Sequence, residues 1–331
     1  MLINLTPHTI TIRTADGEIQ IPPSGMIVRL PSRTELLHNL EIQGGLRVPV
    51  VQQRYTVPAK KRFTLSADSA VGEGMSFGTR VSSDFPVTVE RPAYFEYKGE
   101  WKGGSDACGA KQASKTWYFA EGYTERGRFD TWLCLLNPWN ETAELKVTYL
   151  FGNSMAGSDH LEKTYYVNRS SRLTLNVNEE AGFDREVSLQ VQSTLPVVAE
   201  RPMYFIYKDK WDGGHDVVGA TEPSASWHFA EGTTRQGFET WLCLANPDPA
   251  QSATVTVYYL VGEGQGPNLT RFYVVPPRSR YTVDVNEEIG EGKDVSLQVQ
   301  SNLPVVAERP IYFIYKDKWD GGHDVVGVPG E

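Results

Sequence analysis

The sequence has few cysteines, no long apolar run and no recognisable export signal. Three cysteines in 331 residues cannot form a disulfide framework, and we expect Cys108, Cys134 and Cys243 to be small buried hydrophobes. No apolar stretch approaches the length of a membrane span. The opening MLINLTPHTITIRT lacks the basic region and apolar core of a secretory signal. These absences predict a soluble chain that is made in the cytosol and does not insert into a membrane.

Catalytic and nucleic-acid-binding signatures are also missing. No nucleophile elbow, P-loop, dinucleotide fingerprint or zinc-protease motif occurs. None of the six histidines adjoins a plausible serine or cysteine nucleophile. The net charge of −9 argues against a nucleic-acid backbone as the main partner, because proteins that bind one usually display clustered Lys and Arg. We therefore expect no enzyme activity, no cofactor and no nucleic-acid partner.

What the sequence does contain is an internal repeat. The segment VVAERPMYFIYKDKWDGGHDVVG at 197–219 recurs at 305–327 with a single change, and a diverged copy occupies 87–109. Successive copies lie 110 and 108 residues apart, counted between their shared glutamates. That period is the length of one immunoglobulin-sized β-sandwich.

The repeat extends upstream in the second and third copies only. WYFAEG and FDTWLCLLNP of the second copy match WHFAEG and FETWLCLANP of the third, whereas residues 1–53 fill this slot with unrelated sequence. Seven short segments per copy, rich in β-branched and aromatic residues, indicate antiparallel strands. The sequence therefore predicts an all-β fold of three tandem Ig-like antiparallel β-sandwich domains, at 1–112 (a divergent cap), 113–222 and 223–331. Whether residues 1–53 complete the first sandwich or form a separate unit stays open.

Each repeat places a Glu–Arg pair inside an apolar strand. Adjacent strand residues point to opposite faces, so the two charges cannot pair with each other. A half-buried charge without a partner is costly. We therefore expect structural ion pairs at Glu90, Arg91, Glu200, Arg201, Glu308 and Arg309. The candidate partners of the arginines are Glu121, Glu231, Asp130 and Glu239.

The segment WDGGHD has two interpretations. Asp212, His215 and Asp216, with Asp209 nearby, are chemically reasonable metal ligands. In the first copy the segment reads WKGGSD, which keeps the tryptophan, both glycines and the final aspartate. Such a change would lose a ligand set but keep a Gly–Gly turn. We expect a structural turn that holds no metal.

The combination of WYFAEG, FxTWLCLxNP, NVNEE, VVAERPMYF and WxGGHDVVG resembles Ig-like repeats of unknown function that occur in tandem in large exported proteins of actinobacteria and related bacteria. The resemblance covers residues 117–327 well and 54–109 loosely. The opening LINLTPHTI, with IPPSG and VPVVQQRY, is similar to a small uncharacterised family of phages and bacteria. The first resemblance implies an exported protein, and the second a phage or bacterial one.

Aromatic residues are abundant, with 8 Trp and 16 Tyr. Most must be core, but exposed rings could stack on sugars, and Trp139 in the NPWNET loop is the best candidate for such a platform. The chain stops within four residues of Gly327, so we expect the apolar strand IYFIY before it to be uncovered. The residues of this possible association surface are Tyr312, Phe313, Ile314 and Tyr315.

These observations favour a non-catalytic structural or interaction protein, a tandem β-sandwich rod or assembly subunit of a virion, filament or cell surface. The alternative is a carbohydrate-binding module with exposed aromatics. Residues 1–112 carry a net charge of +2 and the rest −11, which favours head-to-tail self-association. The partners expected are the chain itself or other structural proteins, with glycans as the alternative. A virion or extracellular assembly would be reached without an evident Sec signal; otherwise the chain is cytoplasmic.

Overall fold

The structure is a computed structural model, and its fold is nearly all β. It describes residues 10–14, 17–21, 34–41, 47–152 and 160–330. The strand pairs are antiparallel apart from one short parallel contact, so the predicted all-β class is confirmed. The chain divides into two compact units, Met1–Phe77 and Gly78–Glu331. Among the described residues, no helix is long and apolar enough to cross a membrane.

The described residues of the unit Met1–Phe77 form two hairpins and one helical turn. Its elements are β1 (Ile10–Thr14), β2 (Gly17–Ile21), β3 (Thr34–Glu41), β4 (Arg47–Gln53) and α1 (Ala67–Val71). β1 pairs only with β2 and β3 only with β4 among the described residues. The prediction that residues 1–53 help complete a first sandwich falls partly on residues outside the described ranges, so it stays a prediction.

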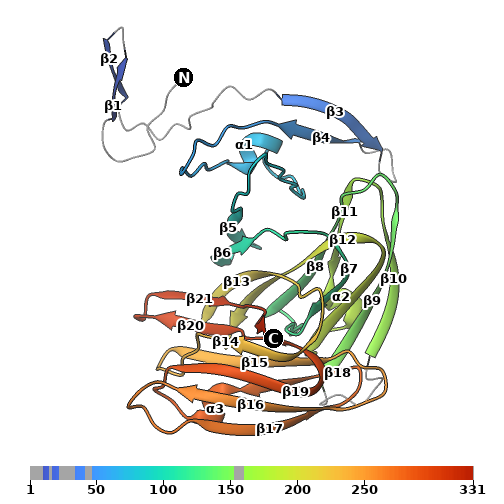
Figure 1. The fold of residues 1–331 in the computed structure, drawn as a ribbon, viewed down its shortest axis with the longest axis vertical. Coiled ribbons are helices and arrows are strands. Elements are labelled where there is room, and N and C mark those ends of the chain that lie inside the picture. Colours follow the sequence, from blue (N-terminus) through green and yellow to red (C-terminus); the bar gives the residue numbers. More distant parts are fainter. Residues whose placement is uncertain (1–9, 15–16, 22–33, 42–46, 153–159, 331) are drawn as a thin grey trace. The chain divides into compact units, whose positions relative to one another are not determined.

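The second sequence repeat, residues 113–222, forms two four-stranded sheets that share one long strand (Figure 1). Its elements are β7 (Ser114–Phe119), β8 (Phe129–Asn137), β9 (Ala143–Gly152), β10 (His160–Val167), β11 (Ser171–Asn176), α2 (Val177–Ala181), β12 (Val187–Tyr207) and β13 (Trp211–Val218). The first half of β12 pairs with β7 and β9, and its second half pairs with β8 and β13. This long strand therefore joins the two layers of a sandwich.

The third sequence repeat, residues 223–331, follows the same plan. Its elements are β14 (Ser224–Phe229), β15 (Phe238–Asn246), β16 (Ala253–Val261), β17 (Leu269–Val275), β18 (Ser279–Asp284), α3 (Val285–Ile289), β19 (Val295–Glu308), β20 (Ile311–Tyr315), β21 (Trp319–His323) and β22 (Val328–Pro329). β19 and β20 together correspond to β12, and the interruption falls at Arg309-Pro310. The equivalent Pro202 lies inside the unbroken β12, so the proline alone does not cause this interruption.

The NEEAG and NEEIG segments each form a single helical turn. Asn176 caps α2 and Asp284 caps α3, each accepting backbone N–H groups with its side chain. Gly182 ends α2 with a φ of 91°, and Gly290 ends α3 with a φ of 79°. Such positive φ values suit glycine, because it has no Cβ to clash.

Each sandwich encloses a buried core with a tryptophan at its centre. Trp117 donates its indole N–H to the carbonyl of Val197 over 2.7 Å, and Trp227 repeats this bond to Val305 over 2.8 Å. Of the cysteines, Cys243 is buried and Cys134 half-buried, but Cys108 is exposed. The expectation of a buried Cys108 is wrong, because the hairpin that carries it has no sandwich of its own around it among the described residues.

The segment WDGGHD is a strand, which corrects the predicted Gly–Gly turn. It lies in β13 and pairs along its length with the end of β12. The reversal comes before it, at Lys208 and Asp209, which have φ values of 51° and 57°. Equivalent hairpins are formed by β20 with β21, and by β5 (Glu90–Tyr97) with β6 (Trp101–Cys108).

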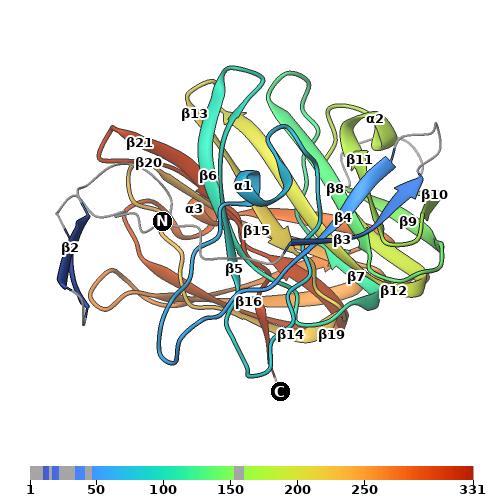
Figure 2. The same cartoon turned by 90° about the horizontal axis from the view of Figure 1, so that it is seen from above.

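The three hairpins stack in sequence order. β13 lies between β6 and β21, as the two views in Figures 1 and 2 agree. The glycines make this close approach possible. A Cβ on Gly213 would lie 3.0 Å from the Cα of Gly321, and one on Gly214 would lie 2.7 Å from the ring of Phe95 in the preceding hairpin. The paired glycines are therefore spacing residues between hairpins.

Replacing a glycine inside the stack should destabilise the protein, while its counterpart at the end of the stack should tolerate the change. We expect Gly213→Ala to cost about 1–3 kcal/mol of unfolding free energy through overpacking. Gly321→Ala should cost less, because its Cβ would meet only a side-chain ring, at 3.3 Å. Urea unfolding of both variants checks this, and equal costs would contradict the stacking role.

Candidate functional site

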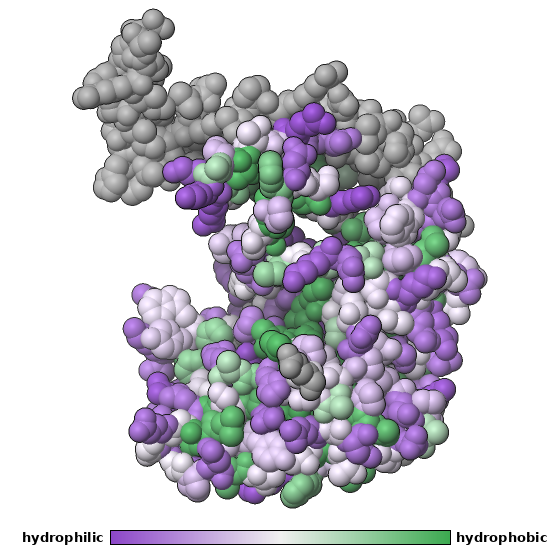
Figure 3. Space-filling view, viewed as in Figure 1, coloured by the Kyte–Doolittle hydropathy of each residue, from purple (hydrophilic) through white to green (hydrophobic). Residues whose placement is uncertain are grey.

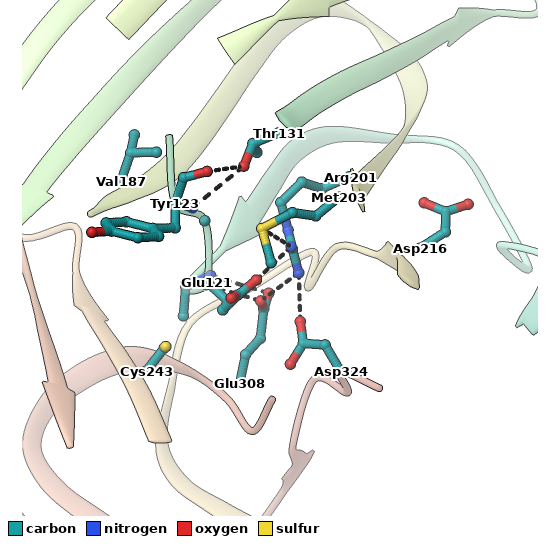
Figure 4. Close-up of polar contacts among 12 residues, drawn as sticks. Glu121, Tyr123, Thr131, Val187, Arg201, Met203, Asp216, Cys243, Glu308 and Asp324 are labelled. Carbon is teal, nitrogen blue, oxygen red and sulfur yellow. Dashed lines mark hydrogen bonds and ion pairs between the residues drawn. The ribbon is translucent and has the colours of Figure 1, made fainter. Parts of the chain in front are cut away.

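The most unusual feature of the structure is a buried charge cluster around Arg201 (Figure 4). The Arg201 side chain is 0% exposed, and Nη1 donates to Oε2 of Glu121 over 2.6 Å. Nη2 donates to Oε2 of Glu308 over 3.2 Å and to Oδ2 of Asp324. One guanidinium thus holds three buried carboxylates.

The cluster joins two sequence repeats. Arg201 and Glu121 belong to the second repeat, on β12 and on the FAEG loop after β7, whereas Glu308 and Asp324 belong to the third. The Glu308 carboxylate also accepts the backbone N–H groups of Ala120 and Glu121, over 3.0 and 2.9 Å. Arg201 therefore pairs both with an acid of its own repeat and with two acids of the next repeat.

Three further hydrogen bonds cross the same junction. The hydroxyl of Tyr312 in the third repeat donates to Oε1 of Glu121 over 3.0 Å. Arg280, buried on β18, donates Nη1 to the carbonyl oxygens of Gly122 and Val187 over 2.6 and 3.2 Å. These bonds satisfy backbone and side-chain groups that would be costly to bury unpaired.

The same pairing occurs one junction earlier. Arg91 of the first hairpin donates Nη1 to Oε2 of Glu200 over 2.8 Å and Nη2 to Asp216. Glu200 and Asp216 are the second-repeat counterparts of Glu308 and Asp324. This junction is more open, with a side-chain exposure of 48% for Arg91.

The middle hairpin, β12 with β13, therefore contacts a neighbouring repeat on each of its two faces. We call the face that contacts the first hairpin its back face, with Glu200, Tyr204 and Asp216. The face that contacts the third repeat is its front face, with Arg201, Phe205, Tyr207 and His215. Alternation along each strand separates the two sets. The same names apply to the equivalent residues of the other two hairpins.

The aromatic contacts, like the ion pairs, are the same at the two junctions. Tyr97 stacks on Tyr204 with ring centroids 4.1 Å apart, and Tyr207 stacks on Tyr312 at 4.3 Å. Phe95 and Phe205 each meet the next hairpin's tyrosine edge-on, at 4.9 Å. Both faces of the middle hairpin are therefore covered by aromatic contacts.

Burial shifts the ionisation of the cluster. Burial raises the pKa of Glu121 to about 6, partly offset by Arg201, and burial together with Asp324 raises that of Glu308. Burial acts to raise the pKa of Asp324, but Arg201, His215, Arg309 and a hydrogen bond with Glu308 together lower that pKa. Burial and Arg201 lower the pKa of His215 to about 3, so its imidazole is neutral.

The arginines and glutamates predicted to pair do so, with one exception. Arg201 meets Glu121, and Nη1 of Arg309 lies 3.3 Å from Glu231. Asp130 and Glu239 pair with lysines instead, Lys98 and Lys208. Glu90 has no hydrogen bond or ion pair to any described residue. The cross-repeat partners, Asp216 and Asp324, were not predicted; their recurrence in every copy was the available signal.

The proposed metal ligands of WDGGHD are not brought together. His215 lies on the front face and Asp216 on the back face, where Asp216 pairs with Arg91. Glu121, His215 and Asp324 do lie close together, with ligand atoms within 4.8 Å of one another. Both His215 ring nitrogens are buried without a hydrogen-bond partner. However, Arg201 already engages both carboxylates.

The residues of the predicted association surface and sugar platform differ in exposure. Tyr312 is buried at the junction, so it does not belong to the predicted association surface; Phe313 and Ile314 are half-buried and Tyr315 is 46% exposed. Trp139 is 43% exposed, and its indole N–H donates to the carbonyl of Pro196 over 2.5 Å.

The sequence matches no known family and no curated protein. Among solved structures, Thermotoga maritima 1070 is 21% identical, with 33% of this chain and 94% of that one aligned and a TM-score of 0.30. The Anabaena sensory rhodopsin transducer is 20% identical, with 28% and 83% aligned and a TM-score of 0.23. A red sea bream transglutaminase is 11% identical, with 67% and 32% aligned and a TM-score of 0.15. Similarities this distant say nothing about function.

Removing Arg201 should be strongly destabilising. Arg201→Ala leaves three buried carboxylates without their cation, and we expect a cost on the order of 3 kcal/mol. Arg309→Ala should cost less, because its partner Glu231 has a side-chain exposure of 71%. Thermal melts of both variants test the difference. An Arg201→Ala protein that melts like the parent would show that the buried cluster does not stabilise the fold.

His215 should make the protein sensitive to acid. Its folded pKa of about 3 lies below the unfolded value of 6.5, so its neutral form stabilises the fold above pH 6.5 and this stability is lost as pH falls. The free-energy difference between parent and His215→Ser should therefore fall by about 2 kcal/mol from pH 7 to pH 5. Serine is the natural residue at the equivalent position, Ser105. A pH-independent difference in urea unfolding would contradict this.

Chelation should leave the protein unchanged. A metal that binds only the folded state must raise its melting temperature, and we expect Arg201 to exclude one from Glu121 and Asp324. The melting temperature should therefore be the same with and without EDTA. A drop of several degrees, restored by one particular divalent cation, would instead assign the cluster to a metal.

Proposed function

We propose that this chain is a non-catalytic structural protein, a rod or assembly subunit of a virion, filament or cell surface made of stacked Ig-like β-sandwich repeats. The supporting observation is that the middle hairpin repeats one contact on its two faces. Arg91 pairs with Glu200 and Asp216, and Arg201 pairs with their counterparts one repeat later. A contact that recurs in the same direction extends a structure in a line.

The burial of the charge cluster supports a structural role over catalysis. A general base must come within hydrogen-bond reach of its substrate, but His215 and Arg201 are both buried between repeats. The carboxylates around them are occupied by the guanidinium. The cluster is suited to holding repeats together, and the partners proposed are further repeats of the same kind.

A rod requires its repeats to resist separation, which hydrogen exchange can measure. With increasing urea, amides of β8 and β12 in the second repeat should lose protection together with those of β15 and β19 in the third, because each repeat keeps the other's charges paired. Arg201→Ala should split this transition into two. Arg169→Ala, at an exposed arginine of the second repeat, is the control and should not. Independent loss of protection in the parent would contradict the proposal.

A further inference from the structure

Within the described part of the unit Gly78–Glu331, the two outer hairpins each leave one face of the repeated junction unfilled. On the front face of the third hairpin, Tyr315 is 46% exposed, whereas its counterpart Tyr207 in the filled junction is 8% exposed. On the back face of the first hairpin, Tyr94 is 88% exposed. Glu90 and Asp106 on that face are exposed as well. In Figure 3 the tip of β20–β21 projects at the left edge of the molecule.

Arg309 shows which bonds are missing. Its Nη1 faces Glu231 as Nη1 of Arg201 faces Glu121. Nη2 of Arg201 holds the two acids of the next repeat, but Nη2 of Arg309 has no partner among the described residues. Nε and Nη1 of Arg309 are also buried without a hydrogen bond. Arg309 thus has the counterpart of Arg201's contact within its own repeat but not the counterpart of its contacts with the next repeat.

The surface beside Arg309 is hollowed where the filled junction is packed. A groove of about 610 Å³ is lined by Glu231, Leu260, Val295 and Tyr315, among others. Its counterpart in the second repeat is covered by the third. Leu150, a residue of the second repeat, packs against the core of the third repeat and is 1% exposed. Its counterpart in the third repeat, Leu260, is 44% exposed. The groove is therefore an unfilled copy of the junction.

We infer that a second copy of this chain docks the back face of its first hairpin on the front face of the third hairpin. Nη2 of Arg309 then binds Glu90 and Asp106 of the incoming copy, as Arg201 binds Glu308 and Asp324. Tyr315 stacks on Tyr94. This inference rests on the proposed stacking function and names the surfaces that extend it.

We take a second copy as the occupant because one chain carries both complementary surfaces. The front face of the third hairpin supplies the arginine, and the back face of the first hairpin supplies the two acids. Such a contact is heterologous, so it propagates head to tail and does not close at two copies. Upstream of the first hairpin the sequence does not match the upstream halves of the other two repeats. The contact between copies is accordingly smaller and weaker than the internal one.

The test is sedimentation velocity of the full chain at low salt over rising concentration. We expect the parent to form dimers and longer species. Glu90→Gln/Asp106→Asn should remain monomeric alone, and so should Arg309→Gln. A mixture of the two should form dimers that grow no further, because each supplies one intact face. A parent that stays monomeric at high micromolar concentration would overturn the inference.

Tyr94→Ala is a second test that does not disturb a buried residue, because Tyr94 is 88% exposed. It therefore keeps the inference testable if the Arg309→Gln variant misfolds. It should abolish association without changing the melting temperature. Tyr166→Ala, at a tyrosine that is 62% exposed elsewhere on the second repeat, is the matched control and should associate like the parent. Association that survives Tyr94→Ala would place the contact elsewhere and overturn the inference. A monomeric parent whose repeats still unfold together would leave the stacking function standing.

Discussion

The structure depends on a buried arginine that is fully paired only when the next repeat is in place. Arg201 is 0% exposed and holds carboxylates from two repeats. Separating the repeats would leave Glu308 and Asp324 without their cation and expose the stacked rings of Tyr207 and Tyr312. A sandwich of this kind is therefore not a self-sufficient bead on a string, because its charge balance lies partly in its neighbour.

The two-residue period of a β-strand converts this dependence into a direction. Glu200 lies on the back face and Arg201 on the front face. One hairpin therefore accepts hydrogen bonds from the preceding repeat's arginine on its back face and donates hydrogen bonds to the next repeat's carboxylates on its front face. The two junctions differ in how far their arginine is buried. Arg91 is half exposed because the first hairpin brings no counterpart of the FAEG loop, whereas Glu121 encloses Arg201 at the next junction. The completeness of the flanking sandwich thus sets how deeply each arginine is buried.

Much of this arrangement could be predicted from the sequence, and the failures have physical causes. The repeat and strand pattern predicted the all-β fold, and the cost of an unpaired charge predicted an acidic partner for Arg201, with Glu121 one of four candidates. The paired glycines were misread as a turn because glycine also permits close approach, here of Phe95 to Gly214. Pairs such as Arg201–Asp324 span 123 residues, and strand alternation alone does not say which repeat a face meets.

The most direct test of the account is a double-mutant cycle across the junction. Arg201→Met, Asp324→Asn and the double variant would be compared with the parent by urea unfolding. A direct pair in a buried network should give a coupling energy of about 1–3 kcal/mol, with the double variant more stable than the sum of the single costs predicts. Costs that add to within about 0.5 kcal/mol would mean that the two residues act independently, and the charge clamp between repeats would be refuted.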